Sequence, residues 1–169
     1  TRSGYYIYKF IDPNLDLLQN RTSVHHWVIM RYAEILLSYA EAMNEAYGPT
    51  GNVGYRLNAV RALNQVRNRV GAVPTAISKE ELREKIRNER RVELAFEDHR
   101  FWDVRRWMIA EQEGVMSGAM YGIKIYWINS SPQEFRYTPY LYENRTFTKK
   151  MYLHPFSTNE VNKGYLIQN

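Results

Sequence analysis

The sequence predicts a mainly α-helical fold that carries a small β element near its C-terminus. Between residues 28 and 107, apolar residues recur at three- and four-residue steps, the period of helices that bury one face. After Gly114 helix formers become scarce, aromatic residues accumulate, and residues 121–127 alternate as a strand does. The 169 residues fit one domain. We therefore expect a single domain over residues 1–169, with a helical core at about 28–113 and an aromatic β/loop region at about 115–169.

The composition is that of an ordinary globular chain, with 44% hydrophobic and 24% charged residues. Cysteine is absent, which excludes disulfides, thiol nucleophiles and thiolate metal sites. The net charge is +5, but basic and acidic residues are interleaved from Arg61 to Trp107, unlike the one-sided stripe of a nucleic-acid-binding surface. We therefore expect no nucleic-acid partner. No apolar run is long enough to span a membrane, and no signal peptide is recognisable.

The N-terminal residues 5–10 are rich in strand formers, and Asp12-Pro13-Asn14 is typical of a turn. We expect a short strand followed by a loop. Two roles are open for the tyrosines of this strand: stacking on a sugar, or packing against the helical body. The packing role is the commoner one for aromatic residues of an edge strand, and we favour it.

The first helix is predicted at residues 28–47, where Gly48-Pro49 ends it. The second is predicted at residues 55–70, where Gly71 suits a left-handed position after the helix. Two helices of this length with a short connector favour an antiparallel hairpin about the size of a tetratricopeptide unit.

Ser78 and Glu81 have the spacing of a capping box, in which each side chain bonds the backbone N–H of the other. This box predicts the start of a third helix that continues to about residue 96. A fourth helix is expected at residues 99–113, ending at Gly114. The short joint between them makes a second hairpin, and two stacked hairpins bury a shared face as helical repeats do.

The C-terminal third is expected to contain a small β element or ordered loops. Residues 121–127 alternate as a half-buried strand, and residues 129–132 are typical of a turn. Residues 135–142 and 147–153 are further extended candidates. A brief final helix is expected to begin at Thr158-Asn159-Glu160.

Residues 86–107, IRNERRVELAFEDHRFWDVRRW, mix charged and bulky apolar side chains that a solvated helix would separate. Charges this close to a core are tolerated when they are paired and hydrogen-bonded. We therefore expect a partly buried Arg–carboxylate network that holds the third and fourth helices together, with tryptophans as packing anchors. The network comprises Arg87, Glu89, Arg90, Glu93, Arg100, Asp103 and Arg105, and the anchors are Trp102 and Trp107.

No motif of nucleophilic, phosphate-binding or metal-dependent catalysis occurs in the sequence. The carboxylates that could form a glycosidase pair are flanked by arginines, which hold them ionised and make them poor general acids. These carboxylates are Glu89, Glu93, Glu97, Asp98 and Asp103. His25 and His26 lack a third ligand at helical spacing, so they do not predict a metal site. We expect no enzyme activity, no cofactor and no metal.

Sugar recognition needs flat aromatic faces for the C–H groups and polar side chains for the hydroxyls. Aromatic residues on exposed loops are therefore the first candidates. Either they bind a ligand or they only tie the β element to the helices. The densest group, with its polar neighbours, is Tyr126, Trp127, Asn129, Arg136, Tyr137, Tyr140 and Tyr142.

Three stretches together resemble the C-terminal part of the SusD/RagB-like outer-membrane glycan-binding lipoproteins. The first is RNERRVELAFEDHRFWDVRRW, and the second is RYAEILLSYAEAMNEAYG followed by LNAVRALNQVRNRVG. The third, MYLHPFSTNEVNKG, is similar to the closing segment of the family. It departs from the family at His154-Pro155-Phe156, where a Pro-Ile-Pro run is usual.

The resemblance implies a non-catalytic protein that captures oligosaccharides or polysaccharides and delivers them to a SusC-like TonB-dependent transporter. It also implies that this chain is a C-terminal fragment of a longer parent, an outer-membrane lipoprotein that faces the exterior. We expect the fragment itself to be soluble, without signal peptide or anchor, and to be capable of self-association through an uncovered apolar face. The alternative is a helical scaffold or protein-interaction fragment without a ligand site of its own.

Overall fold

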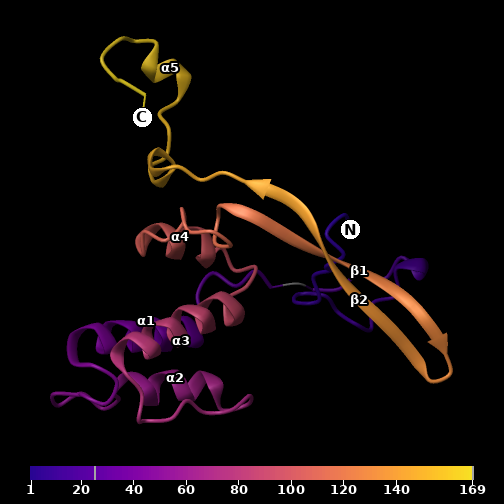
Figure 1. Cartoon of the computed structure of the whole chain (residues 1–169), viewed down its shortest axis with the longest axis horizontal. Coiled ribbons are helices and arrows are strands. Elements are labelled where there is room, and N and C mark those ends of the chain that lie inside the picture. The colour runs from indigo at the N-terminus through magenta and orange to yellow at the C-terminus, as the bar shows by residue number, and fades with distance from the viewer. Residues whose placement is uncertain (25, 169) are drawn as a thin grey trace. The chain divides into compact units, whose positions relative to one another are not determined.

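A computed structural model describes residues 1–24 and 26–168, so that His25 lies outside the described residues. Within them the fold is mainly helical, with five α-helices and one small two-stranded antiparallel sheet (Figure 1). The chain forms two compact units, residues 16–102 and residues 1–15 with 103–168, and the division falls inside helix α4 (His99–Arg106). No helix of the described chain is both long and apolar enough to cross a bilayer.

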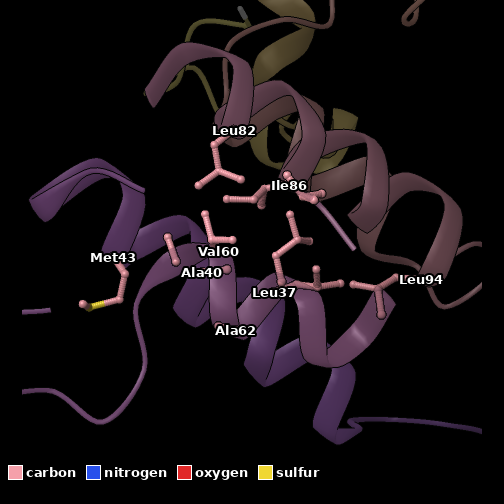
Figure 2. Close-up of a cluster of buried hydrophobic side chains, with 11 residues drawn as sticks. Leu37, Ala40, Met43, Val60, Ala62, Leu82, Ile86 and Leu94 are labelled. Carbon is pink, nitrogen blue, oxygen red and sulfur yellow. The ribbon is translucent and has the colours of Figure 1, made fainter. Parts of the chain in front are cut away.

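Three helices build the first unit: α1 (Tyr32–Tyr47), α2 (Ala59–Arg67) and α3 (Lys79–Glu93). Each contributes buried apolar side chains to one cluster, in which Leu37, Val60 and Leu82 are fully buried (Figure 2). Burying a leucine side chain stabilises a fold by about 2 kcal/mol. The helical period thus predicted this core correctly. A short 3₁₀ helix, η1 (Leu17–Gln19), precedes the helices.

The helix ends of the first unit differ from those expected. Helix α1 begins at Tyr32 because Arg31 is extended, and Ile29 is 85% exposed outside the helix. Helix α2 begins only at Ala59, after Asn58, whose side chain accepts the Arg61 N–H at 2.9 Å. It ends at Arg67, so Val70 of the expected apolar stripe is exposed.

Helix α3 has the predicted start and an earlier end. The capping box is confirmed, with the Glu81 N–H donating to Ser78 Oγ at 3.1 Å and the Ser78 N–H donating to Glu81 Oε2 at 3.0 Å. The helix ends at Glu93 and not near residue 96, because Phe96 and Asp98 have positive φ angles of 64° and 63°. Helix α4 likewise ends at Arg106, two residues before Met108 with a φ of 54°.

The second unit is dominated by strands β1 (Gly118–Ser130) and β2 (Gln133–Arg145), which form a long twisted hairpin (Figure 1). A small apolar cluster in this unit joins Val104, Ala110 and Phe147. The 3₁₀ helix η2 (Lys149–Tyr152) and the short helix α5 (Thr158–Val161) follow the hairpin. The brief final helix expected at Thr158 is therefore confirmed.

Three expectations for the extended segments are wrong. Residues 5–10 form no strand, and Phe10 has a positive φ of 69°. The backbone bond to β1, from the Ile123 N–H to the Ser3 carbonyl at 2.8 Å, lies before this segment. Residues 147–153 contain η2 and not a strand. Residues 121–127 are a strand but not half-buried, since most of the β1 side chains are exposed.

Candidate functional site

The β1–β2 hairpin carries all seven residues that the sequence nominated for ligand binding. The register pairs Tyr126 with Arg136, Ile125 with Tyr137, and Gly122 with Tyr140. Side chains of directly opposed residues in an antiparallel pair point to the same face. The hairpin therefore sorts the nominated residues onto two faces and does not gather them into one site.

One face, called here the apolar face, holds almost only aromatic and aliphatic side chains. Trp127 and Tyr137 lie on it, with exposed fractions of 67% and 59%. The Trp127 indole donates its Nε1–H to the Asn129 carbonyl at 2.5 Å, which orients the ring and leaves its plane uncovered. The members of this face are Tyr121, Ile123, Ile125, Trp127, Phe135, Tyr137, Pro139 and Leu141.

The opposite face, called here the cationic face, combines tyrosines with basic side chains. The Arg136 guanidinium lies 5.3 Å from the centroid of the Tyr126 ring, and Lys124 Nζ lies 5.1 Å from that of Tyr140. Both distances are those of cation–π contacts. The members of this face are Gly122, Lys124, Tyr126, Asn129, Glu134, Arg136, Thr138 and Tyr140.

Two nominated residues stand at irregular places in the hairpin. Asn129 follows a register shift after Trp127, and it holds the turn: its Oδ1 accepts the Ser131 N–H at 3.3 Å. Tyr142 falls at the other shift, between the pairs Met120–Glu143 and Tyr121–Leu141, so it has no directly opposed residue. Neither shift is visible in the alternation of the sequence.

Tyr140 packs within the unit, which leaves less of it for a ligand than the sequence suggested. A Cβ placed on Gly122 would lie 2.8 Å from the Tyr140 ring, so the ring lies directly over the glycine. The Tyr140 hydroxyl donates to the Arg2 carbonyl. The isolated glycine in an otherwise strand-like stretch was the sequence signal for this close approach.

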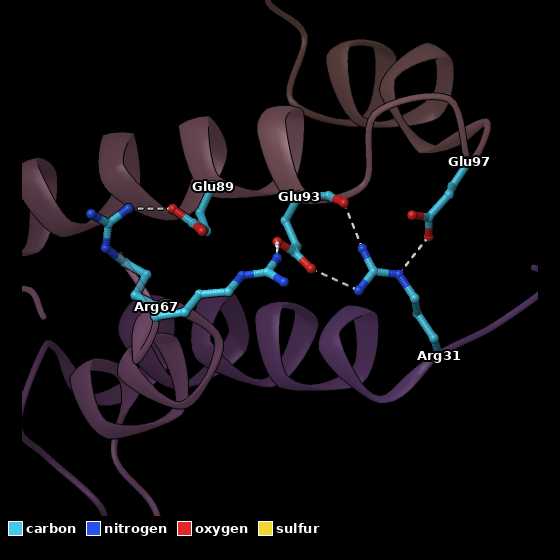
Figure 3. Close-up of polar contacts among 6 residues, drawn as sticks. Arg31, Arg67, Glu89, Glu93 and Glu97 are labelled. Carbon is cyan, nitrogen blue, oxygen red and sulfur yellow. Dashed lines mark hydrogen bonds and ion pairs between the residues drawn. The ribbon is translucent and has the colours of Figure 1, made fainter. Parts of the chain in front are cut away.

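Residues 86–107 are called here the signature, and its carboxylates on α3, Glu89 and Glu93, bind arginines from the N-terminal end of α1 and from the α2 side of the unit (Figure 3). Arg31 donates to Glu97 at 2.7 Å and to Glu93 at 2.8 Å, and Arg69 donates to Glu93 at 2.6 Å. Glu89 binds Arg67. The hydrogen bond to Glu97 raises the pKa of Arg31 above its usual value.

Basic residues of the signature contact side chains of another helix as well as side chains of their own helix. Arg90 Nη1 donates to Ser38 Oγ of α1 at 3.0 Å, and Arg87 pairs with Glu84 within α3 at 3.1 Å. The Arg90 contact and the ion pairs of Glu89 and Glu93 join α3 to α1 and α2. The network predicted between the third and fourth helices stays a prediction. Arg31, Arg67 and Arg69 had not been assigned to the network, because nothing local in the sequence identifies partners so far apart.

The remaining signature residues lie around α4. Asp103 is buried and accepts from Arg106 at 3.1 Å, while the Arg105 guanidinium lies 5.2 Å from the Phe147 ring centroid. Arg100 and Trp107 are half-buried. Trp102 is 59% exposed and contacts Phe101 edge-to-face, which is less burial than expected of a packing anchor.

A groove of about 430 Å³, lined mostly by apolar side chains, lies between α1 and α2. Tyr39 closes one side of it, with its hydroxyl bonded to the Leu57 carbonyl at 2.8 Å. The residues that line the groove are Tyr32, Ile35, Leu36, Tyr39, Tyr55, Arg56, Leu57 and Gln65. No group of three or more side chains able to hold a metal ion occurs in the described part of the chain.

Comparison with known proteins agrees with the resemblance seen in the sequence. The model of the SusD family matches residues 1–169. Two curated relatives come from Formosa agariphila: SusD-like protein P2, 34% identical over 109 residues, and SusD-like protein P25, 37% identical over 87 residues. These alignments cover 60% and 48% of this chain, and 20% and 15% of the relatives.

A crystal structure of a SusD-like protein from Bacteroides fragilis matches the fold with a TM-score of 0.65 and 37% sequence identity. The matched region covers 85% of this chain and 25% of the Bacteroides fragilis chain. The chain thus spans a quarter or less of the length of these relatives. Because the family model matches from end to end, and relatives in sequence and in structure agree with it, the chain belongs to the SusD family.

Proposed function

We propose that this chain is the C-terminal part of an outer-membrane glycan-binding protein and that the apolar face of its hairpin contacts the glycan. The parent would capture oligosaccharides or polysaccharides and deliver them to a SusC-like TonB-dependent transporter, anchored as a lipoprotein that faces the exterior. Membership of the SusD family supports the class of function. The exposed Trp127 indole is the observation that supports a glycan contact on this chain.

The apolar face has the chemistry that sugar rings need. A pyranose offers C–H groups on one side, and these pack favourably on the electron-rich face of an indole or a phenol ring. Trp127 and Tyr137 supply two such rings on one face of adjacent strands, and Tyr121 adds a third. The bond from the Trp127 indole to the Asn129 carbonyl pre-orients the ring, so that less freedom is lost on binding.

Binding without hydrolysis is part of the proposal. The candidate carboxylates Glu89, Glu93 and Glu97 each bind an arginine in the helical unit. A glycosidase needs two carboxyl groups that face a bound sugar across a cleft, whereas these carboxylates are engaged in ion pairs with arginines. The helices would then serve as a rigid body of tetratricopeptide-like hairpins within a single C-terminal domain.

The test is a titration of the chain with a panel of neutral oligosaccharides, followed by tryptophan fluorescence. One glycan class should bind, and Trp127→Ala should weaken that binding by about tenfold, the usual effect of removing one aromatic contact. Trp27→Ala is the matched control, because Trp27 is equally exposed but lies in the other unit. If Trp127→Ala binds the glycan as tightly as the unsubstituted chain does, the hairpin is not the glycan-contacting surface.

The groove between α1 and α2 favours a second function, that of a scaffold that binds protein or a second copy of itself. Its rim exposes Tyr32, Ile35 and Tyr55, an apolar surface of the kind that seeks a partner. If this function holds, Ile35→Glu should abolish concentration-dependent association in light scattering while Trp127→Ala leaves it unchanged. A chain that is monomeric at high concentration would argue against the scaffold.

A further inference from the structure

The cationic face of the hairpin has a charge arrangement that the proposed sugar stacking does not use. Lys124 and Arg136 stand on neighbouring positions of this face, since Lys124 pairs with Thr138 and Tyr126 pairs with Arg136. Both side chains are exposed. Each cation lies over a tyrosine ring, and neither has a carboxylate within ion-pair distance among the described residues.

Opposite charges on facing strands are the usual way in which a hairpin neutralises its basic residues. The other basic residue of β2, Arg145, is neutralised within its own strand, where it binds Glu143. Glu134 also lies on the cationic face, two positions from Arg136 along β2, and it makes no ion pair with Arg136. The face therefore keeps two positive charges against one negative charge.

The tyrosines hold these cations without neutralising them. A ring quadrupole attracts a guanidinium or an ammonium and fixes its position, but it leaves the N–H groups free to donate. A guanidinium fixed in this way can bind a carboxylate or a sulfate ester through two parallel hydrogen bonds. Because Arg136 already occupies one side of the Tyr126 ring, this face is poorer than the apolar face for stacking on a neutral sugar.

We propose that the cationic face binds the acidic groups of an anionic saccharide, through Arg136 and Lys124. The proposal rests on the proposed function, that the hairpin contacts a glycan, and it adds the chemical class of that glycan. The two faces of the hairpin would divide the recognition: Trp127 and Tyr137 contact sugar rings, while Arg136 and Lys124 contact carboxylates or sulfate esters. Tyr126 and Tyr140 act as positioning residues for the two cations.

The experiment compares three polymers with one backbone: dextran, carboxymethyl dextran and dextran sulfate. Binding is measured by calorimetry for the unsubstituted chain, for the double variant Lys124→Gln/Arg136→Gln, and for the control double variant Arg61→Gln/Lys85→Gln. Both double variants lower the net charge by the same amount, and the control residues are exposed on the helical unit. Equal thermal unfolding of the two variants shows that both fold.

We expect an acidic dextran to bind the unsubstituted chain. The affinity of Lys124→Gln/Arg136→Gln for it should be about tenfold lower, because charge-assisted hydrogen bonds are lost. The control variant should lose much less. Selectivity for carboxymethyl dextran points to uronate-like carboxylates, and selectivity for dextran sulfate points to sulfate esters. Either selectivity supports the proposal.

Equal weakening in both double variants would show that only the net charge matters, and it would overturn the proposal. Preferential binding to vesicles of anionic phospholipid over both acidic dextrans would also overturn it, in favour of a membrane surface. In these cases the neutral-oligosaccharide titration with Trp127→Ala still decides the proposed function. A chain that binds neutral sugars through Trp127 but shows no site-specific preference for acidic ones keeps that function and loses this inference.

Discussion

Arg31 donates its Nε–H to Glu97 Oε2 at 2.7 Å, although the two residues are 66 positions apart in the sequence. The Glu97 side chain is only 2% exposed, so its charge depends on hydrogen-bonded partners. The same guanidinium donates to the side chain and the backbone carbonyl of Glu93, at 2.8 and 2.5 Å. One arginine at the start of α1 therefore fixes the segment in which α3 ends (Figure 3).

Removing this arginine should be costly for the fold. Arg31→Ala takes a partner from two carboxylates that are mostly buried, and it should lower the free energy of unfolding by about 3 kcal/mol. Arg31→Lys keeps the charge but not the forked geometry, so its effect should be smaller. Urea denaturation followed by circular dichroism measures both. The exposed Arg61→Gln is the control, and a loss for Arg31→Ala no larger than that of the control would contradict the structure.

Asn64 holds the loop after α2 through both ends of its amide. Its Nδ2 donates to the Val73 carbonyl at 2.9 Å, and its Oδ1 accepts the Val73 N–H at 2.7 Å. Asn64→Asp keeps the acceptor and loses the donor, which should lower the unfolding free energy by about 1–2 kcal/mol at pH 7. The control is Asn88→Asp, at an exposed position whose side chain accepts from Arg91. Its unfolding free energy in the same urea titration should stay close to that of the unsubstituted chain.

The pH dependence of stability should include a contribution from Glu45. Two hydrogen bonds from Arg83, at 2.6 and 2.7 Å, hold the pKa of Glu45 below its ordinary value of 4.5. A carboxyl group whose pKa is lower in the folded than in the unfolded chain stabilises the fold. This stabilisation is complete above pH 4.5 and is lost as the pH falls from there through the folded-state pKa. Denaturation at pH 7 and pH 3 should show that Glu45→Gln removes part of the acid sensitivity. An unchanged pH profile in this variant would contradict the assignment.

Gly122 is expected to tolerate no side chain. A Cβ there would lie 2.7 Å from the Ser3 carbonyl oxygen and 2.8 Å from the Tyr140 ring, so Gly122→Ala should displace the N-terminal segment from β1. The Ile123 amide, now bonded to the Ser3 carbonyl, should then exchange its hydrogen faster in an NMR exchange experiment. Tyr140→Phe keeps the ring and should have a smaller effect. Unchanged protection of Ile123 in the alanine variant would refute this contact.

The sequence predicted the existence of the helices better than their limits. The apolar period depends on burial along a whole face, and Leu37, Leu63, Leu82 and Ile86 follow it into one cluster. The ends depend on single residues, such as the extended Arg31 or the positive φ of Phe96. Glu41 and Glu45 are like charges four residues apart on α1, an unfavourable pair in an isolated helix. Arg83 of α3 donates to Glu45, a contact between helices that the sequence of α1 does not show.

The candidate ligand residues were nominated as a group, but their arrangement depends on the register of the hairpin. Alternation alone puts Tyr126 and Trp127 on opposite faces. It does not tell which residue of β2 joins each of them, because two register shifts and the position of the turn decide that. The division into an apolar and a cationic face therefore emerges only once Trp127 is paired with Phe135 and Tyr126 with Arg136.

The most direct test of the central claim is the NMR spectrum of the tryptophan indole N–H groups during titration with an oligosaccharide selected from the panel. The Trp127 resonance, assigned with Trp127→Phe, should move with ligand concentration, and that of Trp27 should stay in place. This result would locate the glycan on the hairpin. A stationary Trp127 resonance at saturating ligand would contradict the hairpin as the glycan site.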